Sequence, residues 1–181
     1  MAQRSEVDDG IADAALALLR TKGPRSVTVE AVAARSGIAK TTIYRRYRDR
    51  RDMLSAALSR VTTPEPLAAD AQAQDRLRWL IQEAVKTIDV GIGFGGLASL
   101  LTDDDPEFIK LFRRILGRQR AKLESVVDEA KADGSFRADV DGATLVDAIV
   151  GAHIAERART GRTAAGWEKR AFELFWPTVT G

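Results

Sequence analysis

Six basic side chains and one acidic side chain occupy the twelve residues from Lys40 to Arg51, with two threonines and two tyrosines among them. Each Lys or Arg that neutralises a phosphate of a nucleic acid releases counterions, and Arg also binds guanine through two parallel hydrogen bonds. Hydroxyl groups add hydrogen-bond donors that suit phosphates and base edges. The chemistry of this segment is therefore that of a surface for a polyanion.

Two short helices separated by a glycine would position these side chains. Val29 and Val32 recur at helical spacing in the first, and Gly37 tolerates the positive φ of a tight turn. In the second, Ile43 and Tyr47 fall on one face. The opposite face carries the polar and basic groups Thr41, Thr42, Arg45 and Arg46. This is the layout of a helix-turn-helix that docks on double-stranded DNA.

The alternative is that the charges form only a solvated helix face, which is the usual meaning of a charge run. A solvated helix needs neither a turn at Gly37 nor Tyr44 and Tyr47 between arginines. Because several independent features coincide, DNA binding is the better interpretation.

From residue 10 to residue 55 the sequence resembles the TetR family of bacterial transcriptional regulators, through GIADAALALLRTKG and VTVEAVAARSGIAKTTIYRRYRDRRDML. The resemblance implies that Thr28 opens the supporting helix and contacts a phosphate. It places Arg50 where the family has a phosphate-binding Lys. It also implies that three side chains lie at the DNA surface, namely Thr42, Tyr44 and Arg46. The positions that vary with operator sequence, and are therefore expected to read bases, are Lys40, Thr41 and Arg45.

The sequence departs from the family pattern at the start of the second helix. Ala39 stands where a Ser is common, so this helix lacks a side-chain cap worth about 1 kcal/mol. Arg46 and Tyr47 replace the usual His and Phe. The operator sequence therefore cannot be taken from a relative.

The remaining chain predicts an all-α fold of about nine helices, with a helix-turn-helix domain over residues 1–60 and a helical effector-binding and dimerisation domain over residues 61–181. Residues 1–60 hold 12 Lys and Arg against 7 Asp and Glu, whereas the rest holds 16 against 19. A basic head and a mildly acidic body suit this division. Helices are expected over residues 6–22, 67–90, 97–101, 106–133, 141–160 and 163–178, and a further one after Asp49, with a glycine-rich break before 97.

The last two helices carry a candidate dimer interface. Small side chains repeat along one face at Ala148, Gly151, Ala152 and Ala155, and the final helix adds Trp167, Ala171, Leu174 and Phe175. Such stripes also form ordinary intramolecular cores. A lone helix-turn-helix contacts only half a site, whereas a twofold dimer places two copies about 34–36 Å apart. The resemblance also implies a four-helix dimer bundle, and we therefore expect a homodimer.

Other residues could suggest different chemistry. Residues 91–96 satisfy GxGxxG, but no strand precedes them, so a helix break is the better interpretation than a nucleotide site. His153 is the only histidine, which excludes a histidine-based metal cluster. It is either a core residue or a polar contact in an effector cavity. The aromatic residues of such a cavity would be Trp79, Phe94, Phe108 and Phe112, which are also candidates for plain core.

The chain has no Cys, no apolar run approaching 18 residues and a polar N-terminus, which favour a cytoplasmic location without membrane contact. We expect no cofactor, no metal and no enzymatic activity. The predicted function is a dimeric, ligand-responsive transcriptional regulator, with repression preferred, that binds a near-palindromic operator and is released by a small apolar or amphipathic effector. The alternatives are a transcriptional activator, a DNA-organising protein with the same head, or a nucleotide-dependent enzyme.

Overall fold

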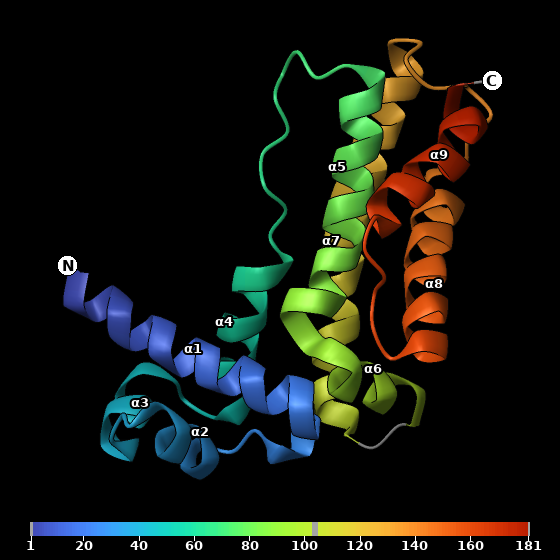
Figure 1. The fold of residues 1–181 in the computed structure, drawn as a ribbon. Coiled ribbons are helices and arrows are strands. Elements are labelled where there is room, and N and C mark those ends of the chain that lie inside the picture. Colours follow the sequence, from blue (N-terminus) through green and yellow to red (C-terminus); the bar gives the residue numbers. More distant parts are fainter. Residues whose placement is uncertain (1, 103–104, 181) are drawn as a thin grey trace. The chain divides into compact units, whose positions relative to one another are not determined.

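The computed structural model describes residues 2–102 and 105–180, and within these ranges the chain is helical and contains no strand. The fold consists of helices α1 to α9 and two short helical turns (Figure 1). The predicted all-α class is therefore confirmed. By its contacts the chain divides into two compact units, residues 1–63 with 87–116 and residues 64–86 with 117–181. The first unit thus includes residues 87–116 in addition to the N-terminal helices.

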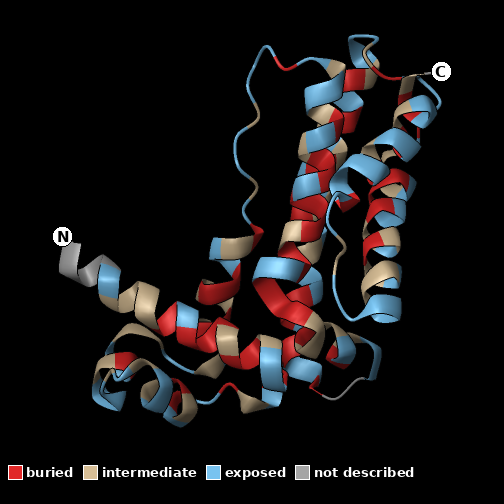
Figure 2. Cartoon of the chain, in the orientation of Figure 1, coloured by how far each residue is buried: buried red, intermediate tan, exposed pale blue. Residues whose placement is uncertain are grey.

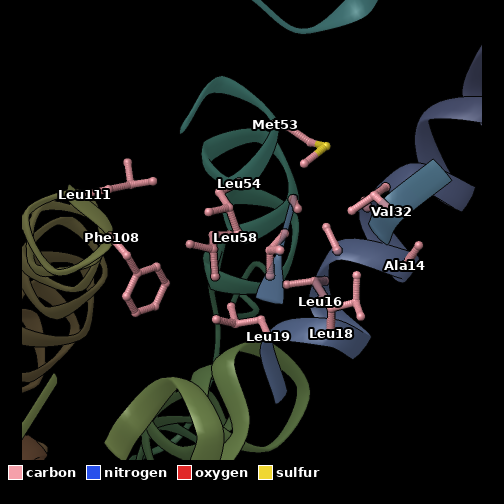
Figure 3. Packing of buried hydrophobic residues seen from close by; sticks show 14 of the residues in the cluster. Ala14, Leu16, Leu18, Leu19, Val32, Met53, Leu54, Leu58, Phe108 and Leu111 are labelled. Atoms are coloured by element: carbon pink, nitrogen blue, oxygen red, sulfur yellow. The ribbon is translucent and has the colours of Figure 1, made fainter. Parts of the chain in front are cut away.

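The first unit is built around α1 (Ala2–Lys22), which packs against α2 (Val29–Ser36), α4 (Arg50–Thr62) and α6 (Gly93–Thr102). It also contains α3 (Lys40–Arg46), the π-helical turn η2 (Thr87–Ile92) and the first part of α7 (Pro106–Ala132). Figure 3 shows apolar side chains of α1, α4 and α7 directed into one core, with Leu19, Leu54, Leu58 and Phe108 among them. Burial of this apolar surface is the main force that holds the helix-turn-helix in place.

Local signals set the ends of the N-terminal helices. Gly23 adopts a φ of 77° and Pro24 opens the short turn η1 (Pro24–Ser26), so α1 ends where the sequence predicts. Asp49 caps α4, because its Oδ1 accepts a hydrogen bond from the backbone N–H of Asp52 at 2.7 Å. These signals act within a few residues, which is why sequence patterns find them.

The glycine-rich segment is not the simple helix break that the sequence predicts. The chain stays helical through η2 and enters α6 at Gly93, whose φ is 59°. A Cβ on Gly95 would lie 2.8 Å from the carbonyl oxygens of Leu19 and Arg20. The glycines therefore allow the backbone of α6 to approach the end of α1, and Arg20 Nε donates to the carbonyl of Gly91 across this contact at 3.1 Å.

The second unit contains α5 (Ala73–Lys86), the part of α7 from Gly117 onward, α8 (Gly142–Thr160) and α9 (Trp167–Thr180). Its core includes Leu80, Leu123, Ile149 and Phe175. In Figure 2 the buried residues of α8 form a stripe along one side of the helix. Asp141 caps α8 through the backbone N–H of Thr144.

Two helix starts in this unit differ from the sequence-based expectation. Helix α5 begins at Ala73 rather than near residue 67, because residues 64–72 contain two prolines and a turn at 69–70. Helix α9 begins at Trp167 rather than near residue 163, because Gly161 and Gly166 both adopt positive φ and extend the loop.

One continuous helical stretch, Ala73–Thr102, is long and apolar enough to cross a membrane by length and composition alone. Half of its most apolar window is buried inside the protein. Core helices of water-soluble proteins meet the same criteria, so this stretch is weak evidence for a membrane span.

Candidate nucleic-acid interface

Helices α2 and α3 form the predicted pair of short helices. Thr28 is the N-cap of α2, and its Oγ1 accepts a hydrogen bond from the backbone N–H of Ala31 at 3.1 Å. Gly37 ends α2 in the left-handed conformation, with a φ of 72°. Both local roles are those that the sequence predicts.

Helix α3 is short and weakly capped. Ala39 occupies the N-cap position and makes no side-chain cap hydrogen bond. Ile43 is fully buried and fixes the helix on the core of the first unit. The face opposite Ile43 is open to solvent. The exposed residues of α3 are Lys40, Thr41, Tyr44 and Arg45, and Thr42 is half-buried.

The basic residues of α3 and of the start of α4 differ in whether they form ion pairs within the protein. Lys40 Nζ lies 3.6 Å from Glu30 Oε1, and both side chains are more than half exposed, so this pair is weak. Arg45 and Arg51 are exposed and have no ion pair with any residue in the described ranges. Both guanidinium groups are therefore accessible to an external partner.

Arg46 is held by the N-terminal helix. Its Nε donates to Asp8 Oδ1 at 2.7 Å, and only 19% of the Arg46 side chain is exposed. A second acid of α1, Asp9, pairs with Arg60 of α4. Arg46 therefore lies at the edge of the surface, and its guanidinium is partly committed to the fold.

Arg50 forms more hydrogen bonds within the protein than Arg46 does. Its Nε donates to the carbonyl of Val27 at 2.8 Å, and its Nη2 donates to the carbonyl of Pro24 at 2.5 Å and to Asp105 Oδ2 at 2.6 Å. The resemblance implies a phosphate-binding role for Arg50, and the structure gives its guanidinium three hydrogen-bond partners within the first unit. No local pattern pointed to a pairing of Arg50 with Asp105, which lies 55 residues away in the sequence.

The five residues proposed for an effector cavity are divided between the units. Phe108 and Phe112 are buried in the first unit with their rings stacked at 5.6 Å, and the half-buried Phe94 belongs to the same unit. Trp79 and His153 belong to the second unit. Phe108 and Phe112 thus fill core, which is the plainer of the two interpretations that the sequence left open.

In the second unit, Trp79 and His153 each have a clear local contact. The indole N–H of Trp79 donates to the carbonyl of Glu65 at 3.0 Å. His153 is buried, and its ring meets the edge of the Trp167 ring at 4.8 Å. An open groove of about 480 Å³ lies elsewhere on this unit, lined by Arg78, Ile81, Gln82, Glu168, Lys169, Phe172 and Glu173.

The residues proposed for the dimer interface fall into two groups. Ala148, Gly151 and Ala155 are exposed on α8 and Ala152 is half-buried, and 63% of Leu174 is exposed on α9. The buried members, which pack in the core of the second unit, are Trp167, Ala171 and Phe175. Two open grooves of about 460 and 400 Å³ run along α8 and α9, and Leu174 lines both.

The sequence and fold have clear relatives. Residues 11–57, which span α2 and α3, match the family model described as "Bacterial regulatory proteins, tetR family". The fold is similar to that of a TetR-family transcriptional regulator from Rhodococcus sp., with a TM-score of 0.72, 18% identity and coverage of 97% of this chain and 100% of that one. Over residues 11–57 the chain therefore matches the TetR family of bacterial regulatory proteins, and its fold is similar to that of a solved TetR-family regulator. The resemblance noted from the sequence is thereby confirmed.

Other structures with a similar fold contain ligands. A transcriptional regulator from Saccharomonospora viridis in complex with choline has a TM-score of 0.66 and 19% identity, covering 97% of this chain and 98% of that one. FadR from Bacillus subtilis in complex with stearoyl-CoA has a TM-score of 0.68 and 18% identity, covering 92% and 96%. At such identities the likeness shows the fold. No curated protein sequence matches the chain significantly.

Proposed function

We propose that this TetR-family regulator is a homodimeric, ligand-responsive repressor that binds a near-palindromic DNA operator. The observation that carries the proposal is the surface of α3, where Lys40, Thr41, Tyr44 and Arg45 are exposed while Ile43 is buried. A helix anchored on one side, with cationic and hydroxyl groups on the other, has the chemistry of a recognition helix in the major groove.

Within this face we assign two roles. Lys40, Thr41 and Arg45 would contact base edges, because they are exposed and stand at the positions that, by the family resemblance, vary with operator sequence. Thr28, Thr42 and Tyr44 would contact the phosphate backbone, and Arg46 would do so from the edge of the surface. Base contacts determine sequence preference, whereas phosphate contacts set affinity and register.

Dimerisation would use the exposed parts of α8 and α9. A small-residue face beside the exposed Leu174 permits close approach of a second copy, and the two grooves that Leu174 lines offer recesses for its side chains. In functional terms residues 1–60 would bind DNA, and residues 61–181 would bind the effector and the second subunit. A twofold dimer doubles the DNA contact that one head makes.

The proposed effector is a small apolar or amphipathic molecule. Structures with this fold hold choline in one case and stearoyl-CoA in another, which supports a ligand-binding role for the helical body. An effector that reached Phe108 or Phe112 would have to separate two stacked core rings. The second unit, with Trp79 and His153, is therefore the better place to begin a search, using thermal shift with choline and acyl-CoA compounds.

The family and fold are those of transcriptional regulators rather than enzymes, and a cytoplasmic location follows from that role.

Selection of duplexes from random DNA tests the proposal. The expected site is a near-palindrome, and Lys40→Ala and Arg45→Ala should relax base preference at particular positions. Arg162→Ala, at an exposed arginine of the second unit, is the matched control and should change nothing. Failure of the native protein to retain any duplex at low salt would refute DNA binding.

A further inference from the structure

The guanidinium of Arg50 joins three separate parts of the first unit. Arg50 is the first residue of α4, and its side chain is 28% exposed. Two of its hydrogen bonds go to carbonyls of Pro24 and Val27, in the segment between α1 and α2. Val27 is fully buried and immediately precedes Thr28, the N-cap of α2. Arg50 thus fixes the point where the helix-turn-helix begins.

Asp105 is equally constrained. Its Oδ2 accepts the third hydrogen bond from Arg50, and its Oδ1 accepts one from the backbone N–H of Phe108 at 3.1 Å. The residue is 8% exposed. It therefore caps the first turn of α7 with one oxygen and holds Arg50 with the other. Through these two side chains the start of α7 is tied to the start of α4 and to the turn before α2.

This arrangement leaves the Arg50 guanidinium little capacity to bind a phosphate. To reach DNA, Arg50 would have to give up its three present hydrogen bonds and leave Asp105 as a buried carboxylate without its cation. Breaking a buried pair by removing one partner is costly, because the remaining charge stays desolvated. The planar fork of Arg also suits three simultaneous acceptors, whereas Lys, as a point charge, can still bind a phosphate but cannot reproduce this fork.

We propose that Arg50 and Asp105 form a clamp that positions the helix-turn-helix on the start of α7, and that Arg50 is a positioning residue rather than a phosphate ligand. The proposal rests on DNA binding by α3, the function proposed above. It assigns a role to Asp105, and it replaces the phosphate contact that the family resemblance implies for Arg50.

The salt dependence of DNA binding separates the two roles of Arg50. A duplex selected by the native protein is titrated with native, Arg50→Gln and Arg50→Lys proteins across a range of salt concentrations. If Arg50 acts only as a clamp residue, Arg50→Gln should weaken DNA binding on the order of tenfold at every salt concentration. The slope of log affinity against log salt should stay unchanged. Arg50→Lys should fail to restore affinity. A slope reduced by about 0.9, with full recovery in Arg50→Lys, would overturn the proposal.

Asp105→Asn gives an independent test, because the two roles of Arg50, clamp residue and phosphate ligand, predict changes in DNA affinity of opposite sign. Asn retains a capping oxygen for α7 but removes the charge that holds Arg50. A clamp predicts weaker DNA binding, and a loss in the double variant Arg50→Gln/Asp105→Asn that is smaller than the product of the single losses. If Asp105 merely competed with DNA for Arg50, Asp105→Asn would bind more tightly. Tighter or unchanged binding would overturn the proposal even if Arg50→Gln failed to fold.

A measurement without DNA keeps this inference distinct from the proposed function. In Asp105→Asn, hydrogen exchange of the backbone amides over residues 27–36 should accelerate relative to the native protein, while exchange in α8 stays the same. If no protein binds DNA but exchange changes as described, the clamp stands and the DNA-binding proposal fails. If the native protein binds DNA and exchange over residues 27–36 is unaltered, the clamp fails alone.

Discussion

Arg46 Nε lies 2.7 Å from Asp8 Oδ1, so a residue of α3 is hydrogen-bonded to α1 across 38 positions of sequence. Asp8→Asn should lower the free energy of unfolding by about 0.5–1 kcal/mol, a modest value because 38% of the Asp8 side chain is exposed. Urea denaturation measures the change. Asp13→Asn, also on α1 but exposed and without an ion pair in the described ranges, is the control. Equal stability of the two variants would contradict the prediction.

Gly95→Ala should destabilise the first unit by about 1–3 kcal/mol, because overpacking forces the backbone to shift. The added Cβ would lie 2.8 Å from the carbonyl oxygens of Leu19 and Arg20, which are backbone atoms that cannot rotate away. Gly117→Ala on α7 is the matched control, since its Cβ would meet nothing within 4 Å. This second variant should gain about 0.5–1 kcal/mol. Thermal unfolding of both variants checks the pair, and a stable Gly95→Ala protein would show that the approach of α6 to α1 is looser than described.

Ala39→Ser should stabilise the protein by about 0.5–1 kcal/mol. Ala39 is the N-cap of α3 and lacks a capping side chain, and its φ of −59° and ψ of 139° suit a capping Ser. Chemical denaturation gives the stability, and operator binding should be retained. Thr28→Ala, which removes the existing cap of α2, should shift stability by a similar amount in the other direction. If both substitutions were neutral, these caps would not limit the stability of the helix-turn-helix.

Leu174→Asp should convert the proposed dimer to a monomer without a large loss of monomer stability. Leu174 is 63% exposed and lines both grooves along α8 and α9, so a charge there would be desolvated by a second copy. Light scattering gives the mass at micromolar concentration. Leu101→Asp, at an apolar residue of α6 that is 82% exposed, should leave the mass unchanged. A native protein that is already monomeric would refute the assignment of this surface.

The contribution of Asp105 to stability should disappear in acid. Burial on its own raises the pKa of Asp105, but hydrogen bonds from Arg50 and from the Phe108 N–H, together with nearby arginine charges, lower it below its ordinary value of 3.8. A carboxyl with a lowered pKa stabilises the fold fully above the unfolded pKa and loses this effect as pH falls through the folded pKa. The stability difference between native protein and Asp105→Asn should therefore be constant near neutral pH and shrink below about pH 4. Urea denaturation over a pH series would expose a difference that instead grows in acid.

Sequence patterns predicted the helix-turn-helix well because its determinants are local. The cap at Thr28, the turn at Gly37 and the cap at Asp49 each act over three or four residues, and the structure contains all three. The apolar spacing that buries Ile43 is equally local. The face that α3 leaves exposed follows from that spacing alone.

The partners of the basic residues could not be predicted in the same way. Asp8 and Asp105 are far in sequence from Arg46 and Arg50, and only the packing of the helices brings the members of each pair together. The glycine-rich segment was misjudged as a plain break for a related reason. The constraint on Gly95 comes from the end of α1, more than 70 residues earlier in the chain.

The single buried anchor of α3 has a consequence for engineering. Because Ile43 is the fully buried residue of this helix, the exposed positions beside it contribute little to holding the protein together. Lys40, Thr41 and Arg45 should therefore tolerate exchange in combination, and under the proposed function libraries at these positions should yield folded proteins with altered base preference. The N-terminal domain could then be given a new DNA preference without a change in the rest of the protein.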